Sequence, residues 1–200
     1  MKSLNMFIVE LEKPINDTIS TSNGVELFID TRFEGGEFAN RVTHGPVIAT
    51  PAKYDTGVEV GDTLYFHHLV VMQEGQKLTG NDKSYFVSFD PDHPVSSQAI
   101  AYKNKDGEII PLNGWSLLEP VEEKEKFPSD LIEMVKLEES LPTKGRVAFG
   151  SKHLEEAGIS VGDVVGFKEN RDYRIKVDGK EYYRTRIMDL MYVEEEVHND

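Results

Sequence analysis

Cysteine is absent from this 200-residue sequence, which excludes disulfide frameworks, thiolate nucleophiles and zinc sites built on cysteine. Basic residues are also scarce: Lys and Arg number 22 against 36 Asp and Glu, giving a formal net charge of −14 at pH 7. Proteins that neutralise nucleic-acid phosphates or dock on anionic membranes need a basic surface, so we expect neither partner. No apolar run approaches the roughly 18 residues of a membrane-spanning helix.

Targeting and catalytic motifs are missing as well. The first five residues carry one lysine and lack the apolar stretch of a signal peptide, so we expect a soluble, cytoplasmic protein. The sequence holds no Gly-x-Ser-x-Gly, His-Glu-x-x-His, P-loop or Gly-x-Gly-x-x-Gly motif. His67 and His68 are adjacent, and neighbouring residues of a strand point to opposite faces, so we expect no shared metal ion. The prediction is a protein that is not an enzyme, with no catalytic residues, metal or cofactor.

What the sequence does contain is short segments rich in Val, Ile, Tyr and Phe, separated by turn residues. This pattern is typical of an all-β barrel or sandwich. Candidate strands in the first half cover 6–11, 46–50, 63–66, 84–89 and 98–102, and 67–72 continues in extended character.

The second half repeats sequence patterns of the first half. Residues 58–66 and 159–167 share a Val-Gly-Asp turn followed by an apolar strand, with Gly61 and Gly162 separated by 101 positions. A repeat of this period indicates two copies of one small β-domain. We expect the copies to span 1–107 and 108–200, joined by a polar linker at 103–107.

Each copy also has a long segment without a clear strand, at 15–43 and at 122–144. Loops beyond roughly 12–15 residues are uncommon in compact domains and are usually functional or disordered. The first holds an apolar island at 25–29, which is either part of a loop or a buried strand. The second places Leu131, Met134 and Val135 at helical spacing, which predicts a short amphipathic helix over 129–137, the only helix candidate of the chain.

The order of these segments resembles the chaperonin-10 (GroES-like) co-chaperonin family in a tandem, two-domain form. The resemblance is carried by an Ile-x-Pro-Leu stretch, a Gly-x-Val strand, the Val-Gly-Asp turn and a terminal strand. The Ile-x-Pro-Leu stretch lies at 109–112 and the terminal strand at 188–194. The Gly-x-Val strand lies at 45–47 and 145–147, and the Val-Gly-Asp turn at 60–62 and 161–163. The resemblance implies an all-β fold of two tandem GroES-like small β-barrels, each with a long loop between its first and second strands.

The resemblance also implies a function and its residues. In the family, a glycine and an apolar tripeptide on the long loop dock in a groove of a chaperonin ring, and the capped chamber assists the folding of a client polypeptide. Because Glu26 interrupts the tripeptide here, either Val25 and Leu27 dock or the register shifts to 27–29. The implied chaperonin-binding residues are Gly24, Val25, Leu27, Phe28 and Ile29 in the first loop, and Leu131, Ile132 and Met134 in the second.

The same resemblance implies a homo-oligomeric ring held by strand pairing between neighbours. Only 51–57 and 151–158 occupy the place of the family's roof hairpin, which resembles phage-encoded co-chaperonins. Glu26 and the helical pattern of the second loop favour an alternative: a GroES-like structural or adaptor protein, such as a phage virion or assembly component, without chaperone activity.

Overall fold

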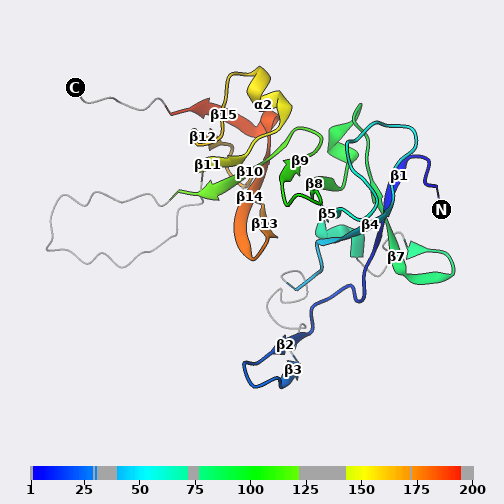
Figure 1. Cartoon of the computed structure of the whole chain (residues 1–200). Coiled ribbons are helices and arrows are strands. Elements are labelled where there is room, and N and C mark those ends of the chain that lie inside the picture. The colour runs from blue at the N-terminus through cyan, green and yellow to red at the C-terminus, as the bar shows by residue number, and fades with distance from the viewer. Residues whose placement is uncertain are drawn as a thin grey trace, which may run out of the picture. The chain divides into compact units, whose positions relative to one another are not determined.

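The computed structural model describes residues 2–28, 30, 40–71, 77–121, 143–171 and 173–194 (Figure 1). The chain divides into two compact units, Met1–Asn113 and Gly114–Asp200. Among the described residues the regular elements are strands, one short α-helix and three 3₁₀ turns, which confirms the all-β prediction. No helix in this part of the chain is long and apolar enough to cross a membrane.

The first unit is built on a seven-stranded antiparallel sheet with the order β6-β7-β1-β4-β5-β8-β9. A separate two-stranded sheet, β2-β3, lies in the long segment between β1 and β4. Two 3₁₀ turns, η1 (His68–Val71) and η2 (Pro94–Ser96), connect strands. The strands are β1 (Met6–Glu10), β2 (Thr18–Ser20), β3 (Glu26–Phe28), β4 (His44–Ala49), β5 (Thr63–Phe66), β6 (Lys77–Leu78), β7 (Asn81–Ser88), β8 (Ala99–Lys103) and β9 (Ile109–Pro111).

The second unit is built on a six-stranded antiparallel sheet with the order β13-β14-β10-β11-β12-β15. A single helical turn, α2 (Lys152–Glu156), lies between β11 and β12, and η3 (Ile187–Asp189) precedes the last strand. The strands are β10 (Trp115–Pro120), β11 (Lys144–Phe149), β12 (Val164–Phe167), β13 (Arg174–Val177), β14 (Lys180–Arg186) and β15 (Leu190–Val193).

The two sheets have the same strand order, strand for strand, except that β9 covers the edge of β8 in the first unit. Their irregularities coincide as well. The register shifts between Ile8 and Val9 where β1 meets β4, and between Leu117 and Leu118 where β10 meets β11. A second shift lies just before Phe66 and just before Phe167, where β5 and β12 meet the next strand. Bulges are positional features of a fold, so their coincidence is structural support for a repeat.

The Val-Gly-Asp turns are built alike in both units. The glycines have φ of +97° at Gly61 and +100° at Gly162, a region open chiefly to glycine. The aspartate side chain accepts the backbone N–H three residues before it, at 2.8 Å in both turns, from Glu59 to Asp62 and from Ser160 to Asp163. All the groups that close the turn lie within a few residues of one another, so the turn could be predicted from the sequence.

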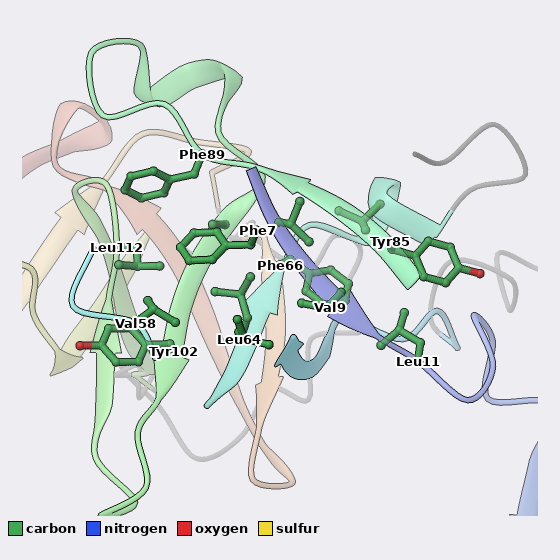
Figure 2. Close-up of a cluster of buried hydrophobic side chains, with 14 of the residues drawn as sticks. Phe7, Val9, Leu11, Val58, Leu64, Phe66, Tyr85, Phe89, Tyr102 and Leu112 are labelled. Carbon is green, nitrogen blue, oxygen red and sulfur yellow. The ribbon is translucent and has the colours of Figure 1, made fainter. Parts of the chain in front are cut away.

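The core of the first unit gathers aromatic and aliphatic side chains from β1, β4, β5, β7 and β8, with contributions from the connecting segments (Figure 2). Phe7 packs edge-on against Phe89, their ring centroids 5.4 Å apart. Each such side chain contributes about 1.5–3 kcal/mol when fully buried. The labelled members are Phe7, Val9, Leu11, Val58, Leu64, Phe66, Tyr85, Phe89, Tyr102 and Leu112.

The core of the second unit differs at the equivalent positions. The cross-strand pair Phe7–Val87 of the first unit is replaced by Ser116–Thr185. The hydroxyls of Ser116 and Thr185 are buried and have no hydrogen-bond partner among the described residues. Leu154 of α2 is fully buried in this core.

Two sequence expectations are corrected by the fold, and a third lies outside the described residues. Residues 67–72 were expected to be extended, but His68–Val71 forms η1. The stretch 103–107, expected to be a linker, comprises the last residue of β8 and the turn that leads to β9. The division between the two compact units falls later in the sequence, between Asn113 and Gly114. The helix expected over 129–137 lies outside the described residues, whereas α2 was not foreseen.

Candidate functional site

The first long segment is not without strands: it carries the antiparallel hairpin β2-β3. The register places Thr18 opposite Phe28 and Ile19 opposite Leu27. The sequence left open whether 25–29 is loop or buried strand. Within it, Glu26–Phe28 forms the exposed strand β3, which corrects the expectation of a buried strand, whereas Val25 lies outside the strand at the turn.

The turn of the hairpin is closed by Thr21. Its backbone N–H donates to the carbonyl oxygen of Val25 at 2.9 Å. Its hydroxyl donates to the same oxygen at 3.0 Å and accepts the N–H of Val25 at 3.1 Å. Gly24 donates back to the Thr21 carbonyl and has a φ of +75°, the left-handed region that side chains disfavour.

The register decides how the apolar residues are distributed. Successive side chains of a strand point to opposite faces, so Val25 and Leu27 lie on one face and Glu26 and Phe28 on the other. Ile19 faces Leu27 directly and therefore joins the first face. The exposed fractions are 56% for Ile19, 55% for Val25, 53% for Leu27 and 83% for Phe28. A hairpin with this much exposed aliphatic surface is characteristic of an interaction site.

The base of the hairpin is tied to the first unit by a short ladder. Ile15 and Arg41 form an antiparallel bridge, and Asn16 donates its N–H to the Asn40 carbonyl at 2.7 Å. Lys13 donates to the carboxylate of Asp17 at 2.7 Å and to the hydroxyl of Thr18 at 2.9 Å. The hydrogen bond from Lys13 lowers the pKa of Asp17, so this carboxylate stays ionised at lower pH than an unpaired aspartate.

Four of the predicted site residues are placed together by the structure: Gly24, Val25, Leu27 and Phe28 all belong to the hairpin. The other four, Ile29, Leu131, Ile132 and Met134, lie outside the described residues.

The sequence analysis did not place Ile19 and Thr21 in one hairpin with Gly24. A signal for both was present, because Asn23-Gly24 is a common hairpin turn and apolar residues alternate on its two sides.

The two adjacent histidines are arranged differently from the expectation. His68 lies in a 3₁₀ turn rather than a strand, and the rings of His67 and His68 are 4.3 Å apart, centroid to centroid, so they do not point to opposite faces. The described residues contain no group of three or more His, Asp or Glu side chains that could hold a metal ion.

Comparison with known proteins identifies the fold. No family model matches the chain. A curated relative, the co-chaperonin GroES of Coprothermobacter proteolyticus (strain ATCC 35245 / DSM 5265 / OCM 4 / BT), is 36% identical over 93 residues, which cover 94% of that protein and 43% of this chain. The chain belongs to the GroES co-chaperonin family. A GroES-family domain thus accounts for less than half of its length, and the GroES-like, all-β fold class predicted from the sequence is confirmed.

Proposed function

We propose that this GroES-family chain is a non-enzymatic, cytoplasmic co-chaperonin that caps a GroEL-like chaperonin ring and assists the folding of a client polypeptide. The observation that carries the proposal is the hairpin β2-β3, which exposes Val25 and Leu27 beyond Gly24 on a chain of this family. In the proposed complex these side chains dock in an apolar groove of the chaperonin.

The energetics are compatible with a reversible cap. Fully burying an aliphatic side chain stabilises a complex by about 1.5–3 kcal/mol, before the costs of association are subtracted. A single hairpin therefore binds modestly. Several hairpins on one assembly bind much more tightly, because the first contact raises the effective concentration of the rest.

We further propose that the two units are tandem copies of one GroES domain. The shared strand order, the coincident bulges and the twin Val-Gly-Asp turns support this. The repeat makes Leu131, Ile132 and Met134 of the second long segment candidates for a second chaperonin contact.

The same repeat supports assembly into a homo-oligomeric ring. In the first unit, β9 pairs with β8 and covers the edge of the sheet. In the second unit the counterpart of β8 is β15, and it is the last strand in the order of the sheet. The side chains of Met191 and Tyr192 in β15 are 66% and 48% exposed. No strand among the described residues pairs with the outer side of β15. An apolar strand edge of this kind is a template for pairing with another chain, and we propose that a second copy fills it.

The experiment that tests the function is deletion of residues 20–30, which removes the turn and β3. We expect the variant to keep the oligomeric size of the wild type on size exclusion and to lose capture of a GroEL-type chaperonin in the presence of ATP. A variant that still binds shows that the hairpin is not the contact. A wild-type protein that binds no chaperonin under any nucleotide supports the alternative, a structural or adaptor role.

A further inference from the structure

Two arginines on β14 of the second unit lie beside the only tryptophan of the chain. The register of β10 against β14 puts Trp115 opposite Arg186 and Leu117 opposite Arg184. The guanidinium carbon of Arg184 lies 5.6 Å from the centre of the Trp115 ring, and that of Arg186 lies 4.3 Å from it. Arg184 also lies over the ring of Tyr173, at 5.5 Å. Both guanidinium groups are therefore held close to aromatic rings.

The polar atoms of this cluster are buried donors without acceptors. Arg184 is 4% exposed and Trp115 is 8% exposed. Neither Nη1 of Arg184 nor Nε1 of Trp115 has a hydrogen-bond partner among the described residues. Guanidinium and indole groups donate hydrogen bonds and accept none, so the group that the cluster lacks is an acceptor. Buried donors of this kind are normally satisfied, because leaving them unpaired is unfavourable.

The cluster also carries positive charge that nearby acids do not neutralise. Burial lowers the pKa of Arg184 to about 10, which still leaves its side chain charged at pH 7. Burial lowers the pKa of Arg186 as well, and the charge of Asp189 offsets only part of that effect. The Asp189 carboxylate already lies 3.6 Å from both Lys168 Nζ and Arg171 Nε. Within the described part of the chain, no carboxylate forms an ion pair with either arginine of the cluster.

The first unit has none of these groups at the equivalent positions. There the same register pairs Met6 with Ser88 and Ile8 with Phe86. Because this strand pairing forms without arginine or tryptophan, the fold itself does not require the cluster. The surrounding sequence differs in charge as well: residues 168–186 hold seven Lys and Arg against four Asp and Glu, in a chain with an acidic excess. A locally basic segment raises the local concentration of anions.

We propose that Arg184, Arg186 and the indole N–H of Trp115 form a binding site for a small oxyanion on the second unit. The oxygens of a phosphate or a carboxylate accept the unpartnered N–H groups of Arg184 and Trp115, and their negative charge neutralises the arginine pair. The planar guanidinium group matches the geometry of both anions. The site is separate from the hairpin β2-β3, so this inference does not rest on the proposed function.

The first test follows Trp115 fluorescence in the full-length protein, because the indole belongs to the site. Sodium phosphate and sodium acetate are each titrated at constant ionic strength and compared with sodium chloride. We expect a saturable change with an oxyanion, at a concentration about tenfold or more below any change with chloride. Saturation by phosphate at the lower concentration identifies a phosphate site, and the reverse order identifies a carboxylate site. If both oxyanions act only as chloride does, the proposal is overturned.

The second test measures thermal unfolding by circular dichroism, with and without the anion. An anion that binds only the folded state raises the Tm, and we expect Arg184→Met and Arg186→Met to lose most of that increase. The matched control is Arg174→Met, which removes an exposed arginine of the same hairpin that donates to Glu181 at 2.9 Å. This control should keep the full increase. Phosphate also stabilises folded proteins by exclusion from their surface, so the difference between variants measures the site.

A purely structural role for Arg184 gives a different result. If the guanidinium only packs against the two rings, Arg184→Met lowers the Tm by the same amount with and without the anion, and this outcome overturns the proposal. If the guanidinium binds an anion, an apolar replacement of this buried, unpaired charge should leave the Tm without the anion unchanged or higher.

The indole N–H is tested by Trp115→Phe, which keeps an aromatic ring and removes the donor. We expect a smaller increase of the Tm with the anion than in the wild type. An unchanged increase excludes Trp115 from the site and contradicts the three-group arrangement.

Discussion

Gly45 and Gly145 occupy equivalent positions where two strands approach closely. A Cβ on Gly45 would meet the terminal methyl group of Leu11 and lie 3.0 Å from the Glu10 carbonyl oxygen. A Cβ on Gly145 would lie 2.7 Å from the Cβ of Leu118, an atom fixed to the backbone. The glycine of the Gly-x-Val motif is thus explained by packing against the first strand of each unit.

This close approach predicts that a methyl group added at Gly145 destabilises the second unit. Gly145→Ala should lower the free energy of unfolding of the second unit by about 1–3 kcal/mol, because the backbone must shift. Trp115, the only tryptophan, lies on β10 of that unit and reports its urea unfolding by fluorescence. Gly45→Ala, which lies in the first unit, is the control for the reporter and should leave the Trp115 transition in place. An unchanged transition in Gly145→Ala would contradict the packing argument.

A second pair of positions shows compensation between the units. The cross-strand pair Tyr65–Ala101 of the first unit is replaced by Gly166–Tyr192 in the second. A Cβ on Gly166 would overlap the ring of Tyr192, so the aromatic ring has changed strands and the opposing residue has become small. The two units thus keep the same strand pairing with different residues at these positions.

Among the elements, β15 differs most from its counterpart. The carbonyl oxygen of Ile100 in β8 accepts the N–H of Leu112 beside β9. The residue equivalent to Ile100 is Met191, so the main chains of Met191 and Val193 face the outer edge of β15, where no described strand pairs. Glu194, by contrast, donates its N–H inward to the Val164 carbonyl. The edge therefore offers hydrogen-bonding groups to a strand from outside.

This orientation predicts a selective assembly defect. Val193→Pro removes an outward N–H without breaking the pairing of β12 with β15, and edge strands tolerate proline. We expect the variant to remain folded by circular dichroism and to shift to smaller species in sedimentation velocity. Val193→Thr keeps the N–H and the β-branched shape, so it should assemble normally. A Val193→Pro protein of wild-type size would exclude β15 as the contact.

For the whole molecule, the net charge of −14 acts against assembly. Every added copy brings the same excess of acidic groups, so like charges accumulate in an oligomer. Raising the ionic strength shortens the Debye length from about 30 Å at 0.01 M to about 8 Å at 0.15 M.

We therefore expect salt to strengthen the oligomer. Native mass spectrometry or sedimentation equilibrium should show a lower dissociation constant at 0.15 M than at 0.01 M salt. The opposite trend would indicate that ion pairs between subunits outweigh their net repulsion. The same mass measurement gives the number of chains in the assembly.

The sequence by itself determined the features whose causes are local. Alternating apolar residues and turn glycines predicted the all-β class. The Val-Gly-Asp turns could be predicted because Gly61, Gly162 and their following aspartates close each turn within a few residues. The four described residues of the candidate site were predicted from the resemblance to the chaperonin-10 family, and that resemblance was visible because Gly24 and the apolar residues after it form one contiguous stretch.

The tertiary structure alone decided what depends on partners distant in the sequence. Whether Val25 and Leu27 are buried or exposed depends on what packs against the hairpin. Ile19 lies on the same face as Leu27 because of the register of β2 against β3. The turn at 103–107 became part of a hairpin because β9 pairs with β8 rather than starting a new domain. The energy of strand pairing depends on which residues meet across the sheet, and a linear pattern does not specify that meeting.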